Sequence, residues 1–151
     1  MKRLAAVALL LVAGRAGAAG CELTVTDLAF GSFALNAGHD IESTANITVS
    51  CVDDGGLPDV SYDLSIDGGL AGSTSGRQMS GPGTLDYNVY RDAARTLAWG
   101  DGGSLGGTVA GNLLLPGLAS ATHTVYGRIP GGQPGVEAGT YTDQLTITLS
   151  Y

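Results

Sequence analysis

The segment Tyr141–Tyr151, with the sequence YTDQLTITLSY, decides the fold of this chain. Apart from Asp143, its odd-numbered residues are apolar, and every even-numbered residue is polar. This is the period of two that a β-strand gives to its side chains, so one face of the segment is apolar. Because threonine suits the outer face of a strand, we predict that Leu145, Ile147 and Leu149 are buried against a second sheet.

The same alternation recurs along the chain. Further apolar–polar runs lie at residues 23–25, 47–49, 60–66, 85–89 and 125–129. Turn-forming clusters rich in Gly, Asp and Pro separate them, and glycine makes up 25 of the 151 residues. No segment beyond the N-terminal region has a helical period. Short strands at this spacing predict an all-β fold, an antiparallel β-sandwich.

The N-terminal region has the layout of a secretory signal peptide. A positively charged start is followed by the apolar run Leu4–Ala13 and then by small residues up to Gly20. This run is too short to cross a bilayer, which takes about 20 residues. We predict that residues 1–20 are cleaved during export, and that residues 21–151 form one domain without a membrane span. A buried N-terminal helix is the alternative.

The exported part is strongly acidic. It keeps four arginines and no lysine against 14 acidic residues, which gives a formal charge of −10. Nucleic acids and anionic membranes are unsuitable partners for such a surface, because their phosphates would meet few cations.

Both cysteines, Cys21 and Cys51, lie in the exported part. In an oxidising compartment two cysteines pair by default, and their disulfide would close a loop of about 31 residues. A second interpretation stays open at this point. Ala18–Cys21 faintly resembles a lipoprotein cleavage site, and Cys21 would then carry lipid. A zinc site is not predicted, because the cysteines and the two histidines, which we expect to be solvated, lack ligand spacing.

No group of residues predicts catalysis. Many carboxylates stand beside glycine, where aspartate forms turns. The glycine-rich segment 100–107 has no lysine to meet a phosphate, and no serine occupies a nucleophile elbow. We therefore predict no catalytic residue, no metal and no cofactor. We expect Arg128 and Asp143 to pair structurally. Five aromatic residues are expected to pack in the core or on a sheet face rather than bind sugar: Tyr62, Tyr87, Tyr90, Trp99 and Tyr126.

An ordered set of motifs extends over nearly the whole exported part. After Cys21 come FGSF at 30–33, LDYNVYRD at 85–92, WGDG at 99–102, VYGRIPGGQ at 125–133, GTYTD at 139–143 and LSY at 149–151. Together these motifs resemble the spore coat protein U domain, which is shared with pilin subunits of the Csu type.

The resemblance implies an immunoglobulin-like sandwich that lacks one strand. A periplasmic pilus chaperone would lend a strand in transit, an outer-membrane usher would export the subunit, and a neighbouring pilin subunit would supply the permanent strand. Backbone hydrogen bonds along an open sheet edge would give affinity, and alternate side chains would fill an apolar groove. We expect this groove to be lined by Leu145, Ile147 and Leu149, with help from Leu23 and Val25. The chaperone would recognise Tyr151.

The predicted function is that of a non-enzymatic structural subunit of a fibre or coat. The protein would pass through the periplasm and end at the cell surface. At most Ala19 and Gly20 would precede Cys21 after cleavage, so the subunit would accept a strand without donating one, as a fibre-end subunit does. Two alternatives stay open, namely a spore coat structural protein and a pilus-tip adhesin that binds a surface or a glycan.

Overall fold

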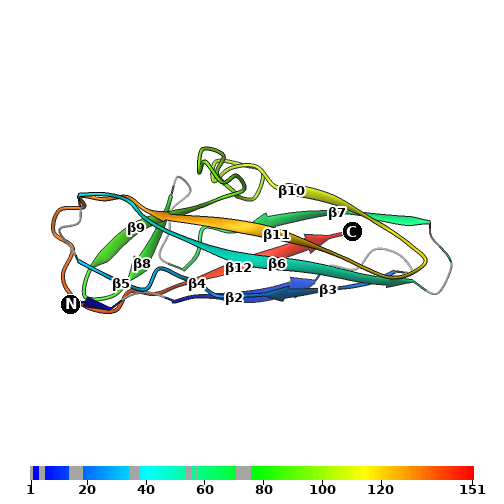
Figure 1. Cartoon of the computed structure of the whole chain (residues 1–151), viewed down its shortest axis with the longest axis horizontal. Helices are drawn as coiled ribbons and strands as arrows, with labels where there is room; N and C mark the ends of the chain where they lie inside the picture. Colours follow the sequence, from blue (N-terminus) through cyan, green and yellow to red (C-terminus); the bar gives the residue numbers. More distant parts are fainter. Residues whose placement is uncertain are drawn as a thin grey trace.

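The computed structural model describes residues 2–3, 6–13, 19–34, 38–53, 56, 58–70 and 76–151, and for residues 2–3 and 6–13 it describes the backbone. The described residues form strands and turns without an α-helix, arranged as a long, flat sandwich (Figure 1). None of them forms a helix that is long and apolar enough to cross a membrane.

Two five-stranded sheets make up the sandwich. The first sheet has the order β10 (Val109–Leu114), β7 (Asp59–Ile66), β12 (Asp143–Ser150), β2 (Ala6–Ala13) and β4 (Leu28–Ala29). The second sheet has the order β3 (Gly20–Val25), β6 (Ile41–Asp53), β11 (Gly117–Ile129), β9 (Thr84–Tyr90) and β8 (Arg77–Ser80). The short strands β1 (Lys2–Arg3) and β5 (Ser32–Phe33) pair with each other. Every pairing is antiparallel except that of β12 with β2.

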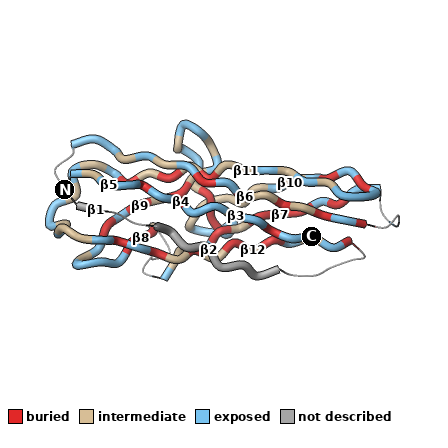
Figure 2. The backbone as a smooth tube through the Cα atoms, turned by 60° about the horizontal axis from the view of Figure 1, so that its bottom comes forward, coloured by how far each residue is buried: buried red, intermediate tan, exposed pale blue. Residues whose placement is uncertain are grey.

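The core lies between the two sheets, where the alternating apolar residues of both inner faces meet. In β12 every odd-numbered residue is buried, and the even-numbered residues are half-buried or exposed. β7 and β9 alternate in the same way, with even-numbered residues buried in β7 and odd-numbered residues buried in β9, as the alternating colours of Figure 2 show. The predicted all-β immunoglobulin-like sandwich is therefore confirmed.

The chain changes sheet just after β3. Thr26 holds this crossing point to β6, because its backbone N–H donates to the carbonyl oxygen of Asn46 and its hydroxyl accepts from the Asn46 N–H, each at 2.9–3.0 Å. β3 therefore belongs to the second sheet, and β4, a few residues later, belongs to the first. This crossing puts Leu28 at the edge of the sheet that contains β12.

Candidate strand-acceptor site

One position in the first sheet is filled from the far end of the sequence. β2 lies between β12 and β4, and it pairs in parallel with β12 from Val7 opposite Asp143 to Ala13 opposite Leu149. It pairs with β4 only at Ala6 and Val7. We call this position between β12 and β4 the slot. Without β2, the backbone edge of β12 that faces the slot would lose its partner strand.

The residues predicted to line a groove gather around this slot. Leu145, Ile147 and Leu149 of β12 are at most 1% exposed. Leu23 is buried and Val25 is half-buried, and both lie on β3, which contacts β2 from the opposite sheet. These positions fit a groove, and their role in binding a foreign strand stays a prediction.

Tyr151, the residue expected to be read by a chaperone, follows β12 directly. It is half-buried and packs against the core. Its recognition by a chaperone also stays a prediction.

The far flank of the slot was not predicted. Leu28 of β4 is 1% exposed and stands in register with Val7. Leu28 and Phe30 pack closely on Gly127, where a Cβ atom would come within 2.8 Å of both side chains. The apolar residues at 28 and 30 are the only sequence signal for this strand, which is too short to reveal a period.

The one acidic residue on the inner face of β12, Asp143, lies at one end of the slot, opposite Val7. The hydroxyl of Tyr87 donates to Asp143 Oδ2 at 2.6 Å, and the backbone N–H groups of Leu70 and Gln144 donate to Oδ1 at 2.9 and 2.8 Å. Burial, followed by the hydrogen bond to Asp143, raises the pKa of Tyr87 well above its ordinary value, so this tyrosine stays a donor. The donors explain how a carboxylate is accommodated there.

A buried arginine, Arg77, binds several strands near the same end of the slot. Arg77 is 1% exposed, and its guanidinium donates to the carbonyl oxygens of Asp67, Ile66 and Trp99 and to Asn88 Oδ1, at 2.6–3.1 Å. Burial lowers its pKa, while the nearby hydroxyl of Tyr87 and the carboxylates oppose this effect. These contacts join the ends of β7, β8 and β9 with the segment that carries Trp99.

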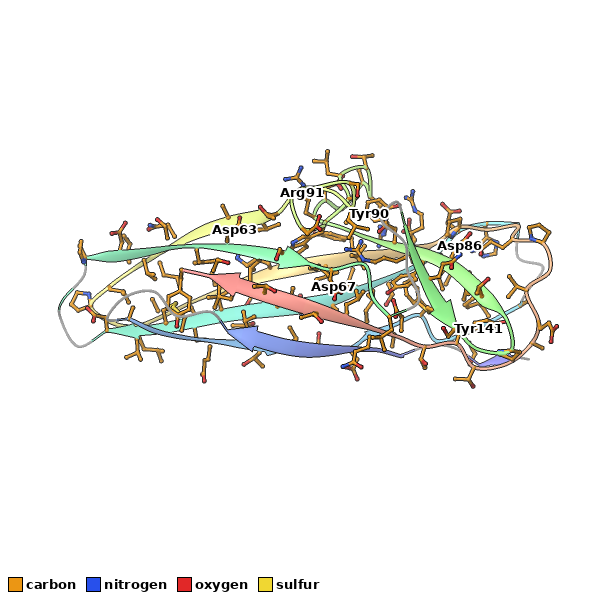
Figure 3. All side chains as sticks on the ribbon, turned by 180° about the vertical axis from the view of Figure 1, so that it is seen from behind. Asp63, Asp67, Asp86, Tyr90, Arg91 and Tyr141 are labelled. Carbon is orange, nitrogen blue, oxygen red and sulfur yellow. A yellow bond between two sulfur atoms is a disulfide. The ribbon has the colours of Figure 1, made fainter. Side chains whose placement is uncertain are left out.

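Asp67 connects this hydrogen-bond network to β12. It lies just beyond the end of β7 (Figure 3) and accepts the backbone N–H of Thr146 at 2.9 Å with its Oδ1 atom. β12 is thus held on one side by β7 and the Asp67 side chain, and on the other side by β2.

The predicted pairing of Arg128 with Asp143 is wrong. Arg128 lies on the outer face of β11 and pairs with Asp40 at 3.3 Å and Glu42 at 3.2 Å, whereas Asp143 points into the core. Alternation is the reason: within their strands Arg128 stands at an outward position and Asp143 at an inward one.

The five singled-out aromatic residues fall into two groups. Tyr62, Tyr87 and Trp99 are core residues at 4%, 3% and 1% exposure, as predicted. Tyr90 and Tyr126 are half-buried neighbours on the outer face of the second sheet, which agrees with the predicted packing on a sheet face. Guanidinium groups of arginines lie over their rings, 5.9 and 5.6 Å from the centroids.

The two histidines differ. His39 is exposed, as expected. His123 is half-buried on β11 and its Nε2 atom lies 2.7 Å from the hydroxyl of Tyr62 on β7, so the expectation of a solvated side chain was wrong here. Burial lowers the pKa of His123. Within the described residues, no group of three or more His, Cys, Asp or Glu is placed to hold a metal ion.

The predicted disulfide is confirmed. Cys21 of β3 and Cys51 of β6 stand directly opposite each other and are bonded through their sulfur atoms. The lipoprotein interpretation is wrong for this structure, since the Cys21 sulfur is engaged.

Comparison with known proteins identifies the family. The model of the spore coat protein U domain matches residues 6–148, and the chain belongs to this family. Protein U of Myxococcus xanthus is 31% identical over 123 residues, which are 76% of this chain and 63% of that protein. The chain thus spans less than two thirds of this curated relative.

Among solved structures, one match is a pre-assembly complex of Acinetobacter baumannii. It is described as the CsuC–CsuE chaperone–tip adhesion subunit complex from archaic chaperone–usher Csu pili. The match has a TM-score of 0.59 at 16% identity, and covers 88% of this chain and 40% of the matched chain. At this identity the match supports the fold.

Proposed function

We propose that the chain is a non-enzymatic structural subunit of an extracellular fibre built by a chaperone–usher route, and that its slot accepts a donor strand. The observation that carries this proposal is the sheet order, in which β12 and β4 are joined only through a strand from the N-terminal segment. Membership of the spore coat protein U family and the fold shared with a Csu pilus subunit support it.

Physical chemistry supplies the driving force for strand insertion. The slot offers the backbone edge of β12 for hydrogen bonds and the side chains of Leu145, Ile147 and Leu149 for apolar contact. Burying one large apolar side chain of the incoming strand contributes about 1.5–3 kcal/mol. In this proposal a periplasmic chaperone supplies the strand first and a neighbouring subunit supplies it later, after passage through an outer-membrane usher.

Co-expression tests the proposal. Residues 21–151, exported without a periplasmic pilus chaperone, are expected to aggregate or be degraded, because an open apolar groove is an aggregation hazard. Co-expression with that chaperone should yield a soluble one-to-one complex. A monomer of residues 21–151 that unfolds cooperatively at high temperature without chaperone or peptide would contradict the proposal.

A tip adhesin is the second candidate, and exposed apolar residues favour it. Leu114 and Leu118 flank the turn between β10 and β11 and are both 78% exposed, and Val52, opposite Leu118, is 48% exposed. Apolar residues exposed at one end of a domain are typical of contact sites. If they bind a surface, Leu114→Ser/Leu118→Ser should keep chaperone binding and lose attachment of cells. Unchanged attachment would exclude this role.

Protein recovered from cells tests the fibre-end position and the coat alternative. N-terminal sequencing of the protein recovered from the cell surface gives the first residue and thus any segment available for donation. Recovery in sheared fibres supports a pilus, whereas recovery only in an extracted spore coat supports the coat protein.

A further inference from the structure

The slot is occupied by a segment of the same chain. β2 contains eight residues, and it pairs with β12 from Asp143 to Leu149, which is all of β12 except its last residue. Its sequence, AVALLLVA, has no charge, no proline and no glycine. Such a segment can form backbone hydrogen bonds along a strand edge in an apolar environment without burying a charge.

The register suits the two faces of β12. Residues opposite each other in a parallel pair lie on the same side of the sheet. Leu9 and Leu11 stand opposite Leu145 and Ile147, which are buried, and Leu10 stands opposite Thr146, which is half-buried. Leu9 and Leu11 therefore occupy positions on the core side of the sheet, and Leu10 occupies a position on the outer side.

We propose that Ala6–Ala13 is an intramolecular occupant of the slot, so that a chain that keeps this segment closes its own acceptor site. Removal of the segment opens the slot to a strand from another protein. The inference rests on the proposed function, because it requires a slot that accepts foreign strands. Only residues 14–19 separate β2 from β3 in the sequence, so the attached segment has a high effective concentration compared with a free strand.

The first experiment tests whether the segment occupies the slot in the same molecule. Leu10→Cys/Thr146→Cys is introduced into the full chain, which is produced without export and oxidised. Neighbouring strands lie about 4.8 Å apart, within the range of Cα distances that a disulfide spans. An intramolecular link between positions 10 and 146, identified by peptide mapping, is expected.

The matched control is Leu9→Cys/Thr146→Cys, whose positions lie on opposite sides of the sheet and should not be linked. A link between two copies, or equal linking in both variants, would overturn the inference.

The second experiment measures access to the slot. The probe is a labelled peptide of residues 6–13 with two lysines added at each end. Full-length chain and residues 19–151 are each diluted from urea into the peptide, and bound peptide is measured by fluorescence anisotropy. Residues 19–151 should bind it, and the full chain should bind it at least about tenfold more weakly, as expected if its slot is open less than a tenth of the time.

Point variants in the same assay distinguish the two faces of β2. In the full chain, Leu9→Asp should restore peptide binding, because a carboxylate on the core side expels the segment, whereas Leu10→Asp should not. Equal peptide binding by the full chain and by residues 19–151 would overturn the inference but leave the proposed function intact. Failure of residues 19–151 to take up any peptide would overturn both.

Discussion

Asp143 shows how a charged residue is accommodated on the inner face of a strand. Its carboxylate accepts one hydroxyl and two backbone N–H groups, and it is 6% exposed. Gly69 makes room for this arrangement: it has a positive φ of 80°, and any Cβ atom there would collide with the carboxylate. The sequence reveals Asp143 as the exception in the alternation, but its partner Tyr87 is 56 residues away and no local pattern connects the two.

Removal of the Tyr87 hydroxyl should therefore be costly. Tyr87→Phe deprives a buried carboxylate of its side-chain donor, so the free energy of unfolding should fall by about 1.5–3 kcal/mol, the range for hydrogen bonds to charged groups. Urea denaturation measures the loss. Tyr90→Phe is the matched control, because that ring is half-buried on the outer face, and its effect should stay within about 0.5 kcal/mol. Equal losses in both variants would contradict the assigned role.

His123 should make stability depend on pH. Its folded pKa is lowered by burial, so the folded state binds fewer protons than the unfolded state. The contribution of neutral His123 to the free energy of unfolding is fully present above the unfolded pKa of about 6.5. This contribution is lost as pH falls from there through the folded pKa. Urea denaturation between pH 8 and pH 5 should show this loss, and His123→Gln should reduce it. If stability does not fall as pH decreases from 8 to 5, or if His123→Gln leaves the loss unchanged, the interpretation is contradicted.

At the scale of elements, β12 has two faces with opposite tolerance to charge. Ile147 is 1% exposed on the core face and Thr148 is half-buried on the outer face. Ile147→Asp buries an unpaired carboxylate and should abolish chaperone binding and surface display, while Thr148→Asp should have little effect. Ile147→Val should cost only about 0.5–1.5 kcal/mol, so it serves as a mild control at the same site. Chaperone pull-down of the three variants gives the ranking, and failure of Thr148→Asp alone would reverse the face assignment.

The disulfide fastens β3 to β6 within one sheet. Removal of its cross-link frees a loop of about 31 residues in the unfolded chain, which should lower the free energy of unfolding by about 3–4 kcal/mol. The comparison is between the wild-type chain and Cys21→Ala/Cys51→Ala in urea. If the double variant is as stable as the oxidised protein, the bond does not contribute as the chain-entropy model expects.

Long strands could be predicted from the sequence, and short ones could not. β7, β9 and β12 carry several alternating apolar residues each, so the period is visible and their buried faces follow from it. β4 has two residues, too few for a period. β2 is uniformly apolar, and such a run is typical of an export signal as well as of a buried strand, so only its place in the sheet indicates a second role.

At the scale of the whole molecule, the sandwich follows from local patterns but its strand order does not. Residues far apart in sequence meet in the slot: Leu28 near the beginning, β12 at the end, and Leu23 from the opposite sheet. The burial pattern determines which side of each strand faces the core. Many different strand orders bury the same sides, so the burial pattern does not determine the order of the strands. The buried face of β12 could therefore be predicted from the sequence, whereas the position of β4 beside the slot could not be predicted without the fold.

The parallel direction of β2 sets a polarity for anything that follows it. β2 runs alongside β12 and ends at Ala13, opposite Leu149, so its C-terminal end points toward the same end of the sandwich as the C-terminal end of β12. A guest strand that enters in the same direction carries the rest of its protein to that end, and a strand in the reverse direction carries it to the end near Asp143. Replacement of one inserted strand by another of opposite direction would therefore move the protein attached to that strand from one end of the subunit to the other. Subunits joined in this way would all have the same orientation along the fibre axis.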